Sequence, residues 1–212
     1  MVPYTKVEDN MKLAEFIKAH VDEINDNNFT KVYEDLVDDL DSELEEREIG
    51  KFTDMLIDAG INPLMYMKTI PQYYMSGSSQ TSIEIPEHIQ SIDFDAFDGC
   101  KGFKSVTIPD NVTSIDNCAF LECTGLTSVI IGDGVKSIGS QAFQSCTRLK
   151  SLTLGSSVTS IGSGAFYGCD RLRNITFNGT MAQWKAIDQN WCWPDDMEYC
   201  TIHCIDGDLK EE

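Results

Sequence analysis

Apolar and polar residues alternate in short runs that recur every 23 residues through the second half of the chain. The copy over residues 103–125 reads FKSVTIPDNVTSIDNCAFLECTG, and LTSVIIGDGVKSIGSQAFQSCTR and LKSLTLGSSVTSIGSGAFYGCDR follow it directly. An earlier copy, QTSIEIPEHIQSIDFDAFDGCKG, begins at Gln80 and lacks only the first apolar residue. Units of this length bury their apolar face only by stacking on their neighbours, so the period predicts a solenoid.

Each unit is predicted to contain two extended segments followed by a helical or turn segment. In the copy at 103–125, Val106 and Ile108 alternate with Ser105 and Thr107, which is typical of a strand with one buried face. Pro109 is expected to end this strand, because proline has no N–H to donate to a neighbouring strand. The apolar residues of the second extended segment are predicted to point inward as well.

Phenylalanine and cysteine each recur once per unit, and both columns are predicted to be buried. Exposing a phenylalanine ring in every unit would forgo burial worth about 2 kcal/mol each, so an inner aromatic spine is favoured. Free cysteine is a small, readily buried side chain, so equal spacing favours a ladder of thiols over disulfides. The two columns are Phe97, Phe120, Phe143 and Phe166, and Cys100, Cys123, Cys146, Cys169 and Cys192.

The first 75 residues show the spacing of amphipathic helices instead of strands. Apolar residues recur at three- and four-residue steps in 11–24, 29–40 and 44–57. Asn62-Pro63 predicts the start of a short fourth helix, since proline is tolerated at the first helical position. We therefore expect a small helical bundle over residues 1–75.

The chain is expected to be an α+β protein in which this helical domain caps a short solenoid of about four and a half coils. Tyr74 lies 23 residues before Phe97, so the segment around Tyr74 is predicted to be the second half of a degenerate first coil. The solenoid is assigned to residues 76–212, with regular repeats over 80–171 and a C-terminal cap over 172–212. The cap is expected to bury bulky aromatic side chains, namely Trp184, Trp191 and Trp193.

The repeat L-x-x-V-x-I-P-x-x-V-x-x-I-x-x-x-A-F-x-x-C resembles the BspA-type leucine-rich repeat, found in bacterial surface proteins and in many gut-bacterial and phage proteins. Leu126–Arg148 and Leu149–Arg171 match it nearly position for position, and Ile175–Trp184 resembles the family's terminal unit. The resemblance covers roughly residues 70–208. It implies a leucine-rich-repeat solenoid with a parallel sheet on its concave face, acting as an adhesion or binding module and not as an enzyme. The chain departs from surface-anchored members in having no export signal and no wall-sorting motif.

The net charge of −19, from 35 acids against 16 bases, disfavours direct binding of nucleic acid and suits a basic protein partner. Nine of the acids lie in residues 34–48, with Arg47 as the one base there. Such a run is typical of a solvated helix face, and a phosphate-mimicking surface is the alternative. The candidate partner-binding acids are Glu34, Asp35, Asp38, Asp39, Glu45 and Glu46.

The second candidate surface is the outer face of the strands, because solenoids use this face for binding. Stacked hydroxyls can also hydrogen-bond to one another, so a structural role is equally consistent with the pattern. An exposed isoleucine among them, Ile130, is a candidate contact point. The candidate partner-binding residues on this face are Ser105, Thr107, Ser128, Ile130, Ser151 and Thr153.

No constellation of residues in the sequence points to catalysis, a metal or a cofactor, so none is expected. Cys200, His203 and Cys204 lack the fourth ligand of a structural zinc site, and their spacing also fits a strand. Lys101, Arg148 and Arg171 follow the repeat cysteines and are expected to pair weakly with acids of a neighbouring coil, not to form a site.

These observations predict a non-enzymatic protein–protein interaction module. One alternative is an acidic inhibitor that mimics nucleic acid and blocks a nucleic-acid-binding host protein. This alternative includes inhibitors that are encoded by phages. The other is a secreted adhesin fragment that binds host matrix or glycan. The start of the sequence carries acids where a signal peptide needs apolar residues, so we expect the cytoplasm of a bacterium or of a phage host. A removed signal peptide would instead place the protein outside the cell.

Overall fold

The computed structural model describes residues 53–54, 57–58, 62–65, 67–189 and 200–210. The helical bundle predicted for residues 1–75 lies outside the described residues except for its final segments. The same is true of the candidate acids between Glu34 and Glu46, and of Trp191, Cys192 and Trp193.

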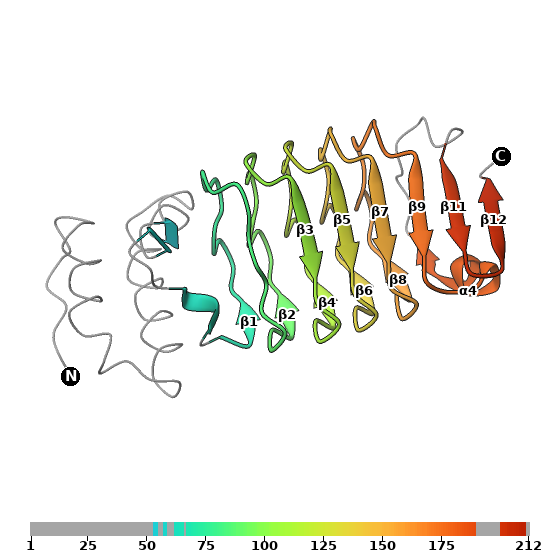
Figure 1. The fold of residues 1–212 in the computed structure, drawn as a ribbon, viewed down its shortest axis with the longest axis horizontal. Coiled ribbons are helices and arrows are strands. Elements are labelled where there is room, and N and C mark those ends of the chain that lie inside the picture. The colour runs from blue at the N-terminus through green and yellow to red at the C-terminus, as the bar shows by residue number, and fades with distance from the viewer. Residues whose placement is uncertain (1–52, 55–56, 59–61, 66, 190–199, 211–212) are drawn as a thin grey trace, which may run out of the picture.

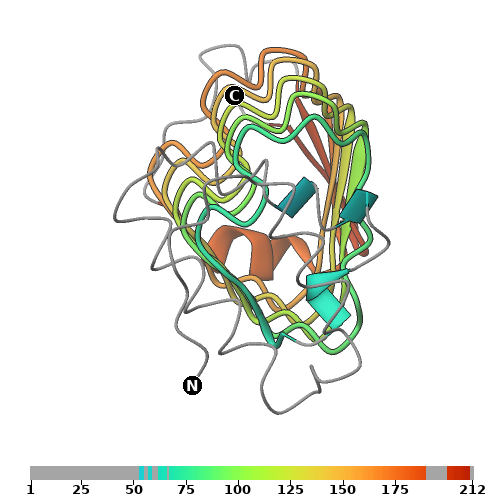
Figure 2. The same ribbon diagram turned by 90° about the vertical axis from the view of Figure 1, so that its left-hand side faces the viewer.

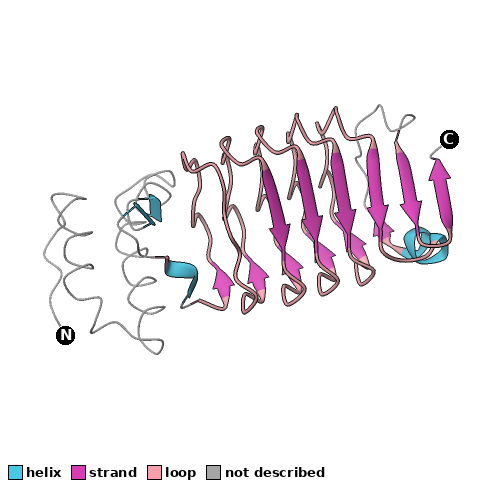
Figure 3. Ribbon diagram, in the orientation of Figure 1, coloured by secondary structure: helices cyan, strands magenta, loops and turns pink. Residues whose placement is uncertain are grey.

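Two six-stranded sheets run along a solenoid (Figures 1 and 3). The long-strand sheet has the order β12-β11-β9-β7-β5-β3, and only its terminal β11–β12 pair is antiparallel. Its strands are β3 (Ser105–Ile108), β5 (Ser128–Ile131), β7 (Ser151–Leu154), β9 (Asn174–Phe177), β11 (Thr201–Cys204) and β12 (Gly207–Lys210). The short-strand sheet is parallel and consists of β1 (Thr69–Ile70), β2 (Ser91–Ile92), β4 (Ser114–Ile115), β6 (Ser137–Ile138), β8 (Ser160–Ile161) and β10 (Asp188–Gln189).

Equivalent residues of successive coils lie directly opposite one another in both sheets. Ser105 pairs with Ser128, and Ser128 pairs with Ser151. Viewed along the solenoid, the coils therefore superimpose almost completely (Figure 2). Within β3, buried Val106 and Ile108 alternate with exposed residues, and the strand ends before Pro109. The predicted alternation and the predicted end of the strand are both confirmed.

The aromatic spine and the thiol ladder fill the space between the sheets, as predicted. The rings of Phe97, Phe120, Phe143 and Phe166 stack with centroids 4.9, 5.0 and 5.4 Å apart. The four described ladder cysteines are free thiols and completely buried. Each ladder thiol donates to a backbone carbonyl oxygen of the preceding coil, with sulfur–oxygen distances of 3.0–3.4 Å.

The turn around each phenylalanine requires left-handed backbone at two positions per coil. Glycine adopts this conformation without steric cost, whereas other residues are strained by it. The first position is held by Asp95, Cys118, Gln141 and Gly164, and the second by Gly99, Glu122, Ser145 and Gly168, with φ between 53° and 74° throughout. The fold therefore keeps the same turn in every coil even where the sequence supplies no glycine.

The first coil is present, but its predicted register is wrong by one residue. Residues in β1 pair with residues in β2 that are 22 positions later, not 23. The backbone N–H of Met75 donates to Ala96 in the way that Phe97 donates to Ala119. Met75 therefore occupies the phenylalanine position, and Tyr74 instead packs edge-on against Phe97 at 6.1 Å.

The solenoid extends beyond the predicted four and a half coils at both ends, because β1 and β10 add rungs to the short-strand sheet. At the N-terminal end, the predicted helix after Asn62 is a single 3-10 turn, η1 (Pro63–Met65), which buries Leu64 completely. Asp54 accepts hydrogen bonds from Ser78 and Ser79, so this segment contacts the first coil directly.

Helix α4 (Met181–Ala186) lies across the C-terminal end of the coils (Figure 2). Thr180 and Gln183 form a capping box at its start, which satisfies backbone N–H groups that the helix leaves without partners. Trp184 is buried and packs edge-on against Phe177 at 5.5 Å. This tryptophan covers the core as predicted for the cap. In the part of the chain that the structure describes, no helix has the length and apolar character needed to cross a membrane.

Candidate functional site

The outer face of the long-strand sheet presents a regular array of small polar side chains, which we call the hydroxyl face: Ser105, Thr107, Ser128, Ile130, Ser151 and Thr153. All six are exposed or half-buried, so the structure brings together every residue that the sequence predicted for this surface. Ile130 is 47% exposed and stands between Thr107 and Thr153 on the neighbouring strands. An apolar side chain with polar neighbours on both sides is the most distinctive feature of the face.

The array continues toward the C-terminal end with Thr176, which follows Thr107, Ile130 and Thr153 at the same 23-residue spacing; beyond it, the sequence did not assign residues to this face. Thr176 of β9 pairs with His203 of β11, which in turn pairs with Asp208 of β12. His203 Nδ1 and Asp208 Oδ1 are 2.9 Å apart and both side chains are about half exposed. At the other end, Ser82 and Glu84 are exposed but do not lie in an assigned strand.

The hydroxyl face is small compared with a stable protein interface. Strands about 4.8 Å apart with a rise of about 3.3 Å per residue give the whole six-stranded sheet an area of roughly 24 × 13 Å, or about 300 Å², and the hydroxyl face occupies three of its strands. A standard interface buries about 800 Å² on each partner. A partner centred on Ile130 must therefore also contact the loops that border the sheet.

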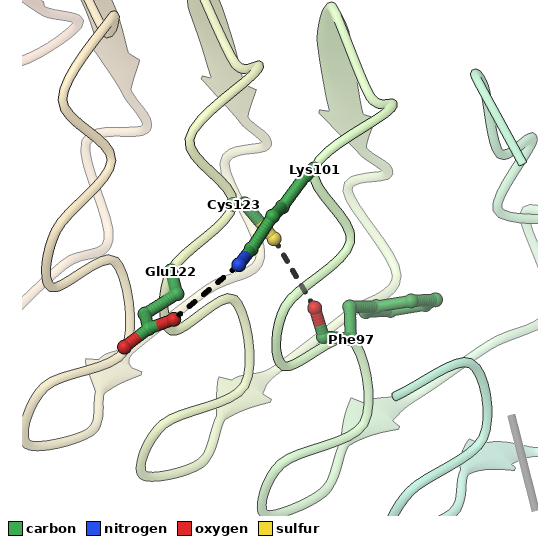
Figure 4. Close-up of polar contacts among 4 residues, drawn as sticks. All are labelled: Phe97, Lys101, Glu122 and Cys123. Carbon is green, nitrogen blue, oxygen red and sulfur yellow. Dashed lines mark hydrogen bonds and ion pairs between the residues drawn. The ribbon is translucent and has the colours of Figure 1, made fainter. Parts of the chain in front are cut away.

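The loops that lead into the long strands carry most of the bases of the repeat region. Lys101 Nζ lies 3.9 Å from Glu122 Oε2 of the next coil, so the predicted weak pairing between coils is confirmed here (Figure 4). Both side chains are more than half exposed, which limits the contribution of this pair to stability. Arg148 and Arg171 form no ion pair with any residue that the structure describes.

Acidic side chains gather at the turns of the first regular coils. Partial burial raises the pKa of Asp93, and the neighbouring Asp116 carboxylate raises it further. Burial also raises the pKa of the Cys118 thiol, with smaller contributions from Asp95 and Asp98. These acids raise the pKa values of Asp93 and Cys118, so they explain local electrostatics without defining a binding site.

The remaining cysteine and histidine residues do not form a recognisable reactive centre. Within the described ranges, no three His, Cys, Asp or Glu side chains gather as a metal site. Burial raises the pKa of Cys204, with smaller contributions from Asp206 and Asp208. Burial is also the largest cause of the strongly raised pKa of Cys123 in the ladder. Raised thiol pKa values oppose nucleophilic reactivity at neutral pH.

Comparison with curated proteins found no match. Three solved structures share sequence with parts of the chain. A T. pallidum leucine-rich repeat protein is 34% identical over 43% of this chain and 42% of its own, with a TM-score of 0.42. A leucine-rich cell surface protein from Faecalibacterium prausnitzii is 30% identical over 54% and 36%, with a TM-score of 0.43. A leucine-rich repeat protein from Bacteroides ovatus is 22% identical over 64% and 45%, with a TM-score of 0.30. The chain spans less than half the length of each.

A match to a family model shows which protein family the chain belongs to. The model of the BspA-type leucine-rich repeat region matches residues 68–190, more than half of the chain, in six copies. Its limits agree with the short-strand sheet, which begins at Thr69 and ends at Gln189. The chain belongs to the BspA-type leucine-rich repeat family.

Proposed function

We propose that the chain is a protein–protein interaction module whose partner docks on the hydroxyl face with Ile130 at the centre. Leucine-rich repeats generally serve as binding surfaces, because the stacked coils display one extended array of side chains. The observation that carries the proposal is the exposure of Ile130 in the middle of an otherwise polar, regular sheet face.

A rigid sheet is suited to this role. The outer side chains are held in register by the backbone hydrogen bonds of β3, β5 and β7, so little conformational entropy is lost when a partner binds. Hydroxyl groups can both donate and accept hydrogen bonds, and they are inexpensive to desolvate compared with charged groups. A sheet face that presents short polar side chains around one exposed isoleucine matches a protein surface better than a small molecule.

The face is tested by site-specific crosslinking with the full chain. A photoreactive amino acid is placed at Thr153 on the hydroxyl face or at Thr159, which is exposed and directly precedes β8 of the short-strand sheet. In extracts of the source organism, we expect a defined protein adduct from position 153 and none from position 159. Equal labelling from the two positions contradicts the proposal.

Ile130→Lys supplies the second test, because it places a charge at the centre of the proposed contact. We expect it to abolish the adduct at position 153. Ile205→Lys is the matched control, since Ile205 is 71% exposed in the turn between β11 and β12 and away from Ile130. Retention of the adduct in Ile130→Lys, or equal loss in both variants, argues against a contact centred on Ile130. The acidic segment 34–48 and the cytoplasmic location stay predictions.

A further inference from the structure

In the four regular coils, basic and acidic residues occupy different parts of the coil. Each coil ends in a four-residue loop that leads into a long strand, and these return loops are residues 101–104, 124–127, 147–150 and 170–173. They hold six of the seven bases between residues 82 and 173, but only one of the ten acids, Asp170. The remainder of the coils is strongly acidic. We call the six exposed bases the basic edge: Lys101, Lys104, Arg148, Lys150, Arg171 and Arg173.

The register of the coils places these bases in rows. The backbone N–H of Arg173 donates to the carbonyl oxygen of Lys150 at 3.2 Å, so these two residues are direct neighbours on successive coils. Lys104 occupies the equivalent position two coils earlier than Lys150. In Figure 1 the strands β3, β5, β7 and β9 point downward, so the return loops that lead into them lie together along the upper edge of the solenoid.

Most of the basic edge has no anionic partner among the described residues. Of its six bases, Lys101 alone forms an ion pair with a described residue, at 3.9 Å from Glu122. The guanidinium of Arg173 donates to the neighbouring carbonyl oxygen of Leu172. In a chain with 35 acids and 16 bases, most exposed bases would be expected to find a carboxylate nearby. Adjacent unpaired cations repel one another, so the arrangement favours an anion supplied from outside.

We propose that the basic edge binds a short acidic segment of the protein partner. This inference rests on the proposed function, because the return loops adjoin the hydroxyl face and supply part of the contact area that the face lacks. It also reverses the sign expected from the net charge, since the repeats select an acidic partner where the composition suggested a basic one. Three of the bases are arginines, whose planar guanidinium matches carboxylates in a two-bond geometry.

A short peptide fits better than a long polyanion. From Lys104 to Arg173 the edge spans three coil steps of about 4.8 Å each, which an extended peptide of about five or six residues covers. A nucleic acid or a long sulfated glycan would pass beyond the edge and meet the acidic parts of the same coils. Charges more than about 8 Å from the contact are screened at physiological salt, so a short ligand responds to the edge alone.

The probe is a fluorescein-labelled peptide of six glutamates, titrated with the full chain at physiological ionic strength, where the distant acids are screened, and followed by fluorescence anisotropy. Arg148→Glu/Arg171→Glu should weaken binding at least tenfold. The control, Lys136→Glu/Lys185→Glu, makes the same change in net charge at exposed lysines outside the edge and should change the dissociation constant less than twofold. Equal weakening in both double variants, or no binding of hexaglutamate by the unmodified chain, overturns the proposal.

Three further measurements show whether the binding is specific to the basic edge and to a peptide. Lys150→Gln/Arg173→Gln should also weaken hexaglutamate binding, which excludes misfolding caused by reversed charges. Tighter binding of a sulfated hexasaccharide or of a hexathymidine oligonucleotide than of hexaglutamate contradicts the assignment to a peptide. Ile130→Lys should leave hexaglutamate binding unchanged. Failure of the basic edge is thereby distinguished from failure of the hydroxyl face, which is read from the adduct at position 153.

Discussion

The thiol of Cys123 donates a hydrogen bond to the backbone carbonyl oxygen of Phe97 in the preceding coil, with sulfur and oxygen 3.1 Å apart (Figure 4). Burial, together with contact with the neighbouring Cys100 thiol, holds the pKa of Cys123 well above its ordinary value. At Cys146, hydrogen bonding with Cys169 raises the pKa most, and burial adds to it. The thiols of Cys123 and Cys146 are therefore neutral hydrogen-bond donors within the core.

We expect the ladder cysteines to resist alkylation in the native protein. Iodoacetamide cannot reach the completely buried sulfur atoms of Cys100, Cys123, Cys146 and Cys169 in the folded chain. At Cys123 and Cys146 the raised pKa also disfavours the thiolate with which it reacts. Cys204 is only partly buried and should be modified well before them. Peptide mass spectrometry over a time course at pH 8 measures the order of modification, with fully denatured protein as the control. Modification of a ladder cysteine as fast as Cys204 would show that the ladder is accessible.

The same thiols should make the solenoid less stable at high pH. A thiol whose folded pKa is raised contributes stability below its unfolded value near 9 and loses that contribution as the pH rises toward the folded pKa. Denaturant midpoints measured between pH 8 and pH 10.5 should therefore fall, most steeply above pH 9. Cys123→Ala should lower stability at every pH but reduce this slope. An unchanged slope would mean that other groups cause the decline.

Removing one ring of the aromatic spine should be strongly destabilising. Phe143 stacks between Phe120 and Phe166 with both interplanar angles at 3°, and it is completely buried. Truncating such a residue leaves a cavity, so Phe143→Ala should lower the free energy of unfolding by about 3–5 kcal/mol. Tyr167→Ala is the control: Tyr167 is 49% exposed, and its truncation should change stability by less than about 0.5 kcal/mol. The two variants are compared by urea denaturation.

The left-handed turns predict opposite effects for two reciprocal substitutions. Ser145 has a φ of 60° and Gly99 has a φ of 67° at equivalent positions. Gly99→Ala should destabilise by about 1–2 kcal/mol, because alanine is strained there although the nearest atom lies 3.7 Å from the added carbon. Ser145→Gly should be neutral or stabilising by up to about 1 kcal/mol. Thermal denaturation tests both, and a destabilised Ser145→Gly would show that the serine side chain contributes more than its backbone strain.

Asp93→Asn should stabilise the protein at neutral pH. Burial and the Asp116 carboxylate raise the pKa of Asp93 above 3.8, so its charged form is disfavoured in the folded state. The destabilisation caused by Asp93 should therefore disappear as the pH falls through the raised pKa toward 3.8. The stability gain of Asp93→Asn over the unmodified chain, measured by denaturation at several pH values, should be largest near pH 7 and vanish near pH 4. A gain that does not depend on pH would exclude electrostatics as its cause.

The regular coils were predictable from sequence because each column contains a single kind of residue. A phenylalanine that recurs every 23 residues buries its ring best by stacking on its copies inside the solenoid. The hydroxyl positions follow from the alternation of inward and outward side chains along each strand. The first coil was placed one residue out of register because Tyr74 looked like a spine aromatic. Gly77 and Gly99, which are 22 residues apart and both left-handed, are the better guide to that register.

Half of the basic edge was noted in the sequence, but Lys101, Arg148 and Arg171 were expected to pair weakly with acids of a neighbouring coil and not to form a site. Lys150 and Arg173 are 23 residues apart, and net charge averages over the many acids elsewhere in the chain, so composition gives no sign that they are neighbours. Only the stacking of coils brings them together. Writing the sequence in rows of 23 aligns Lys104, Lys150 and Arg173, although it does not show that most of the basic edge lacks an anionic neighbour among the described residues.

The constant register of the coils makes a 23-residue unit an exchangeable part of the gene. Lys104, Thr127 and Lys150 are linked in series by identical backbone hydrogen bonds at 2.9 Å, so deleting or duplicating residues 128–150 leaves equivalent atoms to bond with one another. Unequal recombination between repeats can therefore lengthen or shorten the display surface in steps of about 4.8 Å. A lineage can fit this surface to larger or smaller targets without evolving a new core.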